Sequence, residues 1–227
     1  MALILNIETS SAICSVCLAR DGAVMGCKED HSGTNHAALL AVYIKKLFEE
    51  HRMKAADLDA VAVSAGPGSY TGLRIGAATA KGICFAASRP LIAIDSLRIL
   101  AEGMAERNKS IHSVYCPTID ARRNEIYFSL IHAGGTVIAP PRNLELSETL
   151  PFEIRAGEQV VIGGNGREKA MKSWVHKSII ADAETITSSR LMVRLAEEKF
   201  TAAVFENTTA FEPAYIKPVY FTKPAKG

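Results

Sequence analysis

Residues 64–76 read Ser-Ala-Gly-Pro-Gly-Ser-Tyr-Thr-Gly-Leu-Arg-Ile-Gly, and this stretch joins a predicted buried strand to a predicted helix. The apolar run over residues 60–65 predicts the strand, and Gly66-Pro-Gly68 ends it. Ser69 or Thr71 can cap the helix, because a hydroxyl oxygen accepts a hydrogen bond from the free backbone N–H groups. Glycine turns that lead into a helix often bind phosphates, so this turn is the first candidate site.

Two phosphate-binding motifs can be compared with this turn, and neither fits. A P-loop needs Lys and then Ser or Thr after its last glycine, whereas Leu-Arg follows Gly72. The dinucleotide fingerprint needs a third glycine where Thr71 stands. The alternative interpretation is structural, since Gly72, Gly76 and Ala80 recur every four residues and let the helix backbone approach a neighbour closely.

The composition is that of a globular protein with balanced charge. Of 227 residues, 48% are apolar and 22% are charged, and 26 basic against 24 acidic residues give a net charge of +2. This balance argues against a surface that binds a polyanion unaided. The first eight residues lack the basic start of a signal peptide, no apolar run reaches membrane-spanning length, and the five cysteines form no disulfide framework. We therefore expect a cytoplasmic protein without a membrane partner.

Cys14 and Cys17 form a C-x-x-C motif inside a predicted strand over residues 12–19. Strand residues three positions apart point to opposite faces of a sheet, whereas a metal or redox site needs both sulfurs on one side. Buried free thiols are therefore the expected state of this motif.

The order of predicted elements repeats along the chain. The first half contains strands over residues 2–8, 12–19, 23–28, 60–65 and 91–95, a hairpin turn at Asp21-Gly22, and helices over 34–50 and 72–88. The second half contains strands over 114–120 and 125–132, a turn at Gly134-Gly135, a strand with a glycine turn over 160–166, and a helix over 187–199 capped by Ser188 or Ser189. No long helix is predicted over 136–157, and residues 211–220 form an extended tail with prolines. The repetition implies two similar α/β domains.

This duplicated pattern resembles the superfamily of actin, hexokinase and Hsp70. Three stretches, Ile4–Leu18, Gly66–Arg74 and Ile119–Tyr127, are similar to the signatures of the TsaB family of bacterial tRNA threonylcarbamoyladenosine biosynthesis proteins. The resemblance implies an α/β fold with two tandem actin-like (ribonuclease H-like) domains, each a mixed five-stranded sheet flanked by helices, the second of them degraded. We expect an N-terminal domain over residues 1–104 and a smaller C-terminal domain over 105–227, whose tail could pack back on the first.

The same resemblance implies a non-catalytic subunit. Such a protein binds and activates the paralogous enzyme TsaD and helps to recruit the ATPase TsaE. The complex threonylcarbamoylates the adenosine adjacent to the anticodon in ANN-decoding tRNAs. The expected partners are therefore a TsaD-like paralogue in a heterodimer, a TsaE-like ATPase, a second copy of the chain when it is alone, and tRNA only indirectly through the complex.

The resemblance also implies that this chain has no catalytic, metal or cofactor site of its own. The metal histidines of the paralogue match Ser96 and Leu100, and leucine cannot bind a metal. At the two phosphate hairpins of the superfamily, Glu8-Thr-Ser10 lacks glycine, and Arg122 and Arg123 would crowd a nucleotide. The alternative hypothesis is a small-molecule kinase or ATPase of the same superfamily. We do not expect a peptidase, because the sequence shows neither metal ligands nor a nucleophile with an adjacent base.

Two predicted helices offer a candidate partner surface. The first carries a broad apolar arc and the second carries small residues, so two such pairs could pack as a four-helix bundle. The candidate interface residues are Leu40, Tyr43, Ile44, Leu47, Gly72, Arg74, Gly76, Ala77 and Ala80. The alternative is that the arc only covers its own sheet. We further expect Arg74 to pair with a carboxylate, and Arg122 and Arg123 either to touch tRNA or to be solvated.

Overall fold

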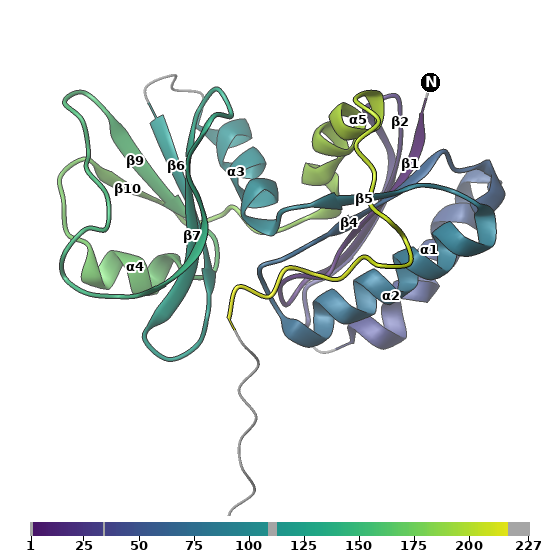
Figure 1. Ribbon diagram of the computed structural model, residues 1–227, viewed down its shortest axis with the longest axis horizontal. Coiled ribbons are helices and arrows are strands. Elements are labelled where there is room, and N and C mark those ends of the chain that lie inside the picture. The colour runs from purple at the N-terminus through teal and green to yellow at the C-terminus, as the bar shows by residue number, and fades with distance from the viewer. Residues whose placement is uncertain (1, 34, 109–112, 218–227) are drawn as a thin grey trace, which may run out of the picture.

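The structure, a computed structural model, describes residues 2–33, 35–108 and 113–217 and contains two five-stranded sheets (Figure 1). The first sheet consists of β1 (Leu3–Glu8), β2 (Cys14–Arg20), β3 (Ala23–Asp30), β4 (Ala60–Ser64) and β5 (Leu91–Ile94), in the order β3-β2-β1-β4-β5. β1 pairs antiparallel with β2 and parallel with β4. We call this sheet and its helices the first lobe.

The second sheet repeats this arrangement. It consists of β6 (Ser113–Asp120), β7 (Glu125–His132), β8 (Val137–Glu145), β9 (Gln159–Gly163) and β10 (Ile179–Asp182), in the order β10-β9-β6-β7-β8. β6 pairs antiparallel with β7 and parallel with β9, as β1 does with β2 and β4. The predicted α/β fold class, with two mixed five-stranded sheets flanked by helices, is confirmed.

Helices from distant parts of the chain cover the two faces of the first sheet (Figure 1). These helices are α1 (His36–His51) and α2 (Tyr70–Ala87) on one face, and α5 (Val193–Thr201) on the other. Leu40 and Leu47 of α1 pack with Ile7 of β1, whereas Leu195 of α5 packs with Ile4 of β1. Because alternate strand residues point to opposite faces, β1 is buried along its whole length.

The helix α3 (Ser96–Arg107) follows β5 but packs against the second sheet. Its side chains Ala101 and Met104 are buried with Tyr115 and Val161 of that sheet. The short helix α4 (Arg167–Ser173) lies on the opposite face, where Trp174 at its end is 1% exposed. The boundary that we predict between residues 104 and 105 falls inside α3.

The segment after α5 returns across the first lobe, as the yellow trace in Figure 1 shows. Phe211 is buried in the core, and the Ala214 N–H donates to the Ala65 carbonyl at 2.7 Å. Lys217 then forms an ion pair with Glu125 at the start of β7, so this segment contacts both lobes. Residues 218–220 of the predicted tail lie outside the described residues.

The predicted helix over residues 187–199 is divided in the structure. A 3-10 helix, η2 (Ser189–Met192), precedes α5, and Ser188 caps it by accepting a hydrogen bond from the Arg190 N–H at 3.1 Å. The Ser189 N–H donates to the Ser15 hydroxyl of β2 at 2.9 Å, so this tertiary contact holds the backbone away from regular α-helical geometry. A second 3-10 helix, η1 (Ala55–Asp57), precedes β4.

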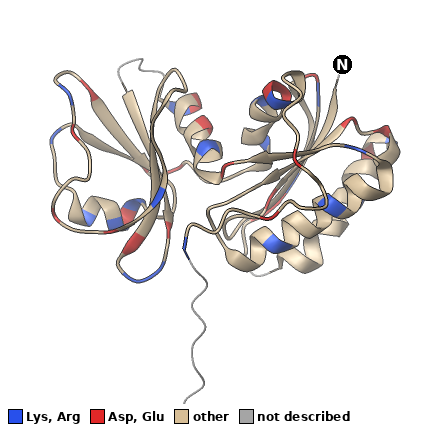
Figure 2. Ribbon diagram, in the orientation of Figure 1, with Lys and Arg blue, Asp and Glu red and all other residues tan. Residues whose placement is uncertain are grey.

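Acidic and basic residues are interspersed along the chain in both lobes (Figure 2). Between the lobes, Arg194 of α5 donates to Glu102 of α3 at 2.9 Å, and Arg190 pairs with Glu106 at 3.0 Å. Exposed ion pairs of this kind contribute at most about 1 kcal/mol each. Within the described ranges, no helix combines the length and the apolar character needed to cross a membrane.

Candidate functional site

The glycine turn packs against the loop that joins β1 to β2. A Cβ atom on Gly68 would lie 2.2 Å from the Ser10 carbonyl oxygen, and that oxygen accepts a hydrogen bond from the Ser69 N–H at 2.7 Å. The Ser69 hydroxyl caps α2 by accepting from the Gly72 N–H at 3.3 Å, which confirms one of the two predicted caps. The turn is therefore closed over its own chain instead of forming an open phosphate cradle.

Two glycines of α2 also allow this helix to lie close to the loop after β1. A Cβ atom on Gly72 would lie 2.1 Å from the Thr9 carbonyl oxygen, and one on Gly76 would lie 2.3 Å from the Thr9 hydroxyl oxygen. No side chain larger than hydrogen fits at these two positions without a shift of the loop. The structural interpretation of the glycine repeat is confirmed, and the neighbour that the helix approaches is the end of β1.

Glu8 lies at the carboxyl end of β1, and none of its surface is exposed. Its Oε1 atom accepts hydrogen bonds from the Ser10 N–H at 2.6 Å and from the Ser10 hydroxyl at 2.5 Å. Burial raises the pKa of this carboxyl to about 7, although the bonds from Ser10 act in the opposite direction. Its Oε2 atom has no hydrogen-bond partner among the described residues. The Oε1 atom is therefore already occupied by hydrogen bonds within its own loop.

The second loop, between β6 and β7, holds its aspartate in internal contacts. The Asp120 carboxylate accepts from the Arg122 N–H at 2.6 Å and pairs with Lys169 at 2.6 Å. Arg122 and Arg123 have φ angles of 67° and 49°, a left-handed conformation that residues other than glycine rarely adopt. An aspartate already paired with lysine is not free to hold the magnesium ion of a nucleotide.

The positions that match the paralogue's metal ligands lie at the start of α3. Ser96 is fully buried, and Leu100 packs with Leu97 and with Ile119 of the second sheet. In the part of the chain that the structure describes, no group of three or more His, Cys, Asp or Glu side chains is arranged so that it could hold a metal ion. The residues at this place do not fit a metal ion.

The predicted interface needs correction, because most of its residues lie in the core. Seven of the nine are buried, namely Leu40, Ile44, Leu47, Gly72, Gly76, Ala77 and Ala80. Their side chains, or the close approach that their small size permits, pack the two helices on the first sheet and on Thr9. For these seven residues the alternative is correct, since the arc covers its own sheet. Tyr43 is half-buried, and Arg74 is exposed.

The opposite, solvent-facing side of the same two helices is exposed and apolar in part. We define this outer surface by residues Ala41, Val42, Phe48, Ala78, Gly82 and Phe85. Phe85 is 86% exposed and Val42 is 43% exposed. A groove of about 520 Å³ runs between the helices, with Ile44, Phe48 and Ile83 among its lining residues. The exposed pair Ala78 and Gly82, four residues apart, would allow another helix to approach closely.

Arg74 pairs with aromatic rings, contrary to the carboxylate that we expect from the sequence. Its guanidinium lies 4.3 Å from the centre of the Tyr70 ring, and its Nε donates to the Tyr215 hydroxyl at 3.3 Å. The two rings lie 5.0 Å apart. The returning tail is thereby fixed to the start of α2, a long-range contact that no local pattern in the sequence indicates.

Comparison with known proteins places this fold in a family. The model of the family described as "TsaD: tRNA N6-adenosine threonylcarbamoyltransferase" matches residues 29–222. The tRNA threonylcarbamoyladenosine biosynthesis protein TsaB of Haemophilus influenzae is 34% identical over 128 residues, which are 56% of this chain and 53% of that protein. The TsaB protein of Bacillus subtilis is 28% identical over 182 residues, which are 79% of this chain and 75% of that protein.

A solved structure gives the same result for the fold. A Pseudomonas aeruginosa protein described as similar to the peptidase YeaZ superposes with a TM-score of 0.85 at 23% identity, over 96% of this chain and 100% of that one. The matched segment spans about half the length of the Haemophilus influenzae relative. The chain belongs to the TsaD family, and the Haemophilus influenzae and Bacillus subtilis relatives are TsaB proteins of tRNA threonylcarbamoyladenosine biosynthesis.

Proposed function

We propose that the protein is a non-catalytic subunit in the threonylcarbamoylation of the adenosine adjacent to the anticodon of ANN-decoding tRNAs. It binds and activates a TsaD-like paralogue in the cytoplasm and helps to recruit a TsaE-like ATPase. The tRNA is contacted through the complex. Membership of the family supports the process, and the family's TsaB relatives carry the name of this modification.

The residues at the family's functional positions support the proposal that this chain has no catalytic activity of its own. Leu100 occupies a ligand position with an apolar side chain, and Asp120 is neutralised by Lys169. Glu8 is fully buried, and its Oε1 atom is held by two hydrogen bonds from Ser10. A small-molecule kinase or ATPase would need these carboxylates free, so nucleotide turnover by the isolated chain would favour that alternative instead.

The observation that carries the proposal is the exposed outer surface of α1 and α2. Phe85, 86% exposed, lies on the same outer surface as Val42, 43% exposed, and an exposed apolar patch, in contrast to a single exposed side chain, marks a surface that meets another protein. A TsaD-like paralogue shares this fold and would present a matching helix pair, so the two pairs can form a four-helix bundle. A second copy of this chain presents the same surface when the paralogue is absent. A stable interface of this kind buries roughly 1,200 to 2,000 Å² in total.

The test is reconstitution with matched surface variants. Full burial of one phenylalanine contributes about 2 kcal/mol, so Phe85→Asp should weaken binding of the paralogue by at least about 30-fold. Val175→Asp is the control, because Val175 is 88% exposed on the second lobe. Binding is measured by titration calorimetry, and modification is measured on a tRNA transcript with the paralogue, the ATPase and the activated precursor.

Two outcomes would contradict the proposal in different ways. Equal yields of modified tRNA with and without this protein would exclude the subunit role. Normal binding by Phe85→Asp, together with a yield that depends on the protein, would exclude only the outer surface as the interface.

A further inference from the structure

Cys17 and Cys27 are direct neighbours on two adjacent strands of the first sheet. Cys17 of β2 is paired in register with Cys27 of β3, and both contribute to a small cluster with Val193 of α5. Cys14 packs in a different cluster on the opposite face of the sheet, so the prediction for the C-x-x-C motif is confirmed. The cysteine that can meet Cys17 is therefore in the next strand, not three residues away.

The spacing of paired strands suits a disulfide between these two residues. Residues directly opposite each other in an antiparallel pair have Cα atoms about 4.5 to 5.5 Å apart. A disulfide spans Cα distances of about 4.4 to 6.8 Å, so the register that pairs Cys17 with Cys27 places them within its reach. Both thiols are free in the structure.

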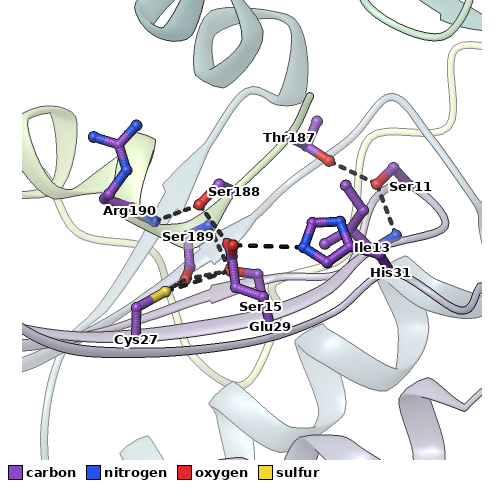
Figure 3. A network of polar contacts seen from close by, with 10 residues as sticks. All are labelled: Ser11, Ile13, Ser15, Cys27, Glu29, His31, Thr187, Ser188, Ser189 and Arg190. Carbon is purple, nitrogen blue, oxygen red and sulfur yellow. Dashed lines mark hydrogen bonds and ion pairs between the residues drawn. The ribbon is translucent and has the colours of Figure 1, made fainter. Parts of the chain in front are cut away.

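The surroundings of Cys27 favour its thiolate. Its sulfur lies 3.7 Å from the Ser189 hydroxyl and 4.0 Å from the Ser15 hydroxyl. Figure 3 shows Cys27 beside these two serines. Hydrogen bonding with Cys17 lowers the pKa of Cys27 below its ordinary value, and Ser189 and Ser15 add to this effect despite partial burial. Cys27 lies on the edge strand β3 and is partly exposed, whereas Cys17 is fully buried.

The other cysteines lack these features. Burial raises the pKa of Cys14 and of Cys84 to about 11, and burial also raises the pKa of Cys116. All three are buried. Reaction of a cysteine with an oxidant requires the thiolate and access, so Cys27 is the favoured point of attack.

We propose that Cys27 is a peroxide-reactive thiol and that Cys17 resolves its oxidised form as a cross-strand disulfide. The Cys27 thiolate attacks one oxygen of hydrogen peroxide, which breaks the O–O bond and gives a sulfenic acid and hydroxide. The Cys17 sulfur then attacks the sulfenic sulfur, forms the S–S bond and displaces the hydroxyl group as water. In sum, two thiols and one hydrogen peroxide give one disulfide and two waters.

The experiment uses the full chain, hydrogen peroxide as the oxidant, and peptide mapping after the free thiols are alkylated. Trypsin separates residues 1–20, which carry Cys14 and Cys17, from residues 21–28, which carry Cys27. We expect a reducible cross-link between these peptides, with loss of two hydrogen atoms in mass. The Cys14→Ser variant should keep the cross-link, whereas the Cys17→Ser variant should lose it and accumulate a Cys27 sulfenic acid that dimedone labels.

Circular dichroism of each variant before oxidation establishes that it is folded. A cross-link that persists in Cys17→Ser would overturn the assignment of the resolving residue. Cys27 that remains alkylatable in the wild-type chain after peroxide treatment, while added glutathione is oxidised, would overturn the proposal as a whole.

Discussion

Replacement of Glu8 by glutamine should stabilise the protein, and the gain should depend on pH. The carboxyl is fully buried and its pKa rises from 4.5 to about 7 on folding. A rise of this size costs the folded state about 3 kcal/mol, at about 1.4 kcal/mol per pKa unit. Glutamine has nearly the same shape and cannot ionise, and its amide oxygen can accept both hydrogen bonds from Ser10.

The sign follows from proton binding. Below about pH 4.5 the carboxyl is protonated in both states, so ionisation makes no difference. Between pH 4.5 and about 7 the unfolded chain releases the proton while the folded chain keeps it, so stability falls as pH rises. Above about pH 7 the carboxyl is ionised in both states, and the folded state carries the full cost of about 3 kcal/mol. The advantage of Glu8→Gln should therefore be small at pH 4.5, grow through this window, and level off near 3 kcal/mol.

Urea unfolding at a series of pH values measures this advantage directly. Glu148→Gln is the control, because Glu148 is exposed and should give the same stability as the wild-type chain at every pH. A difference between Glu8→Gln and wild type that does not vary with pH would refute the reasoning. A difference that grows as pH falls would do the same.

Two further changes test the packing of each lobe by the same unfolding assay. Gly72→Ala should destabilise by about 1 to 3 kcal/mol because its Cβ would meet the Thr9 carbonyl oxygen at 2.1 Å, whereas Gly82→Ala, with no atom within 4 Å, should stabilise α2 slightly. Equal stabilities for the two variants would show that the loop yields freely. Trp174→Ala should lower the free energy of unfolding by about 3 to 5 kcal/mol, because the indole is packed in the second lobe with its ring centre 6.1 Å from that of Phe128. Its control, Val175→Ala, should change little, and a comparable loss in both would argue against a buried Trp174.

The sequence predicts eight of the ten described strands and the duplicated order, because their signals are local, but it does not predict β8 and β10. Apolar runs and the turns at Asp21-Gly22 and Gly134-Gly135 place both hairpins correctly. The sequence does not predict helix α3, because its buried side chains are divided between the two lobes and form no single apolar stripe. The outer surface was missed for a related reason. Burial of Leu40 and Leu47 follows from the sheet beneath α1, and the sequence does not show which side of the helix that sheet covers.

The pairing of Cys17 with Cys27 shows why register is harder to predict than the existence of a strand. A two-residue turn at Asp21-Gly22 places Arg20 opposite Ala23. If the strands continued from Arg20 and Ala23 without an irregularity, Cys17 would lie opposite Gly26. The ladder shifts by one residue between Leu18 and Ala19, and this shift brings Cys27 into that place.

The exchange of helices between the lobes determines how the chain can unfold. A fragment ending at residue 104 would lack α5, so Ile4 and Ile92 on that face of the first sheet would lie in water. The remainder would likewise lack most of α3, which supplies Ala101 and Met104 to the second sheet. Each lobe therefore depends on a helix encoded with the other. We expect the two lobes to melt in a single transition, and a protease that cuts between them to release no folded half.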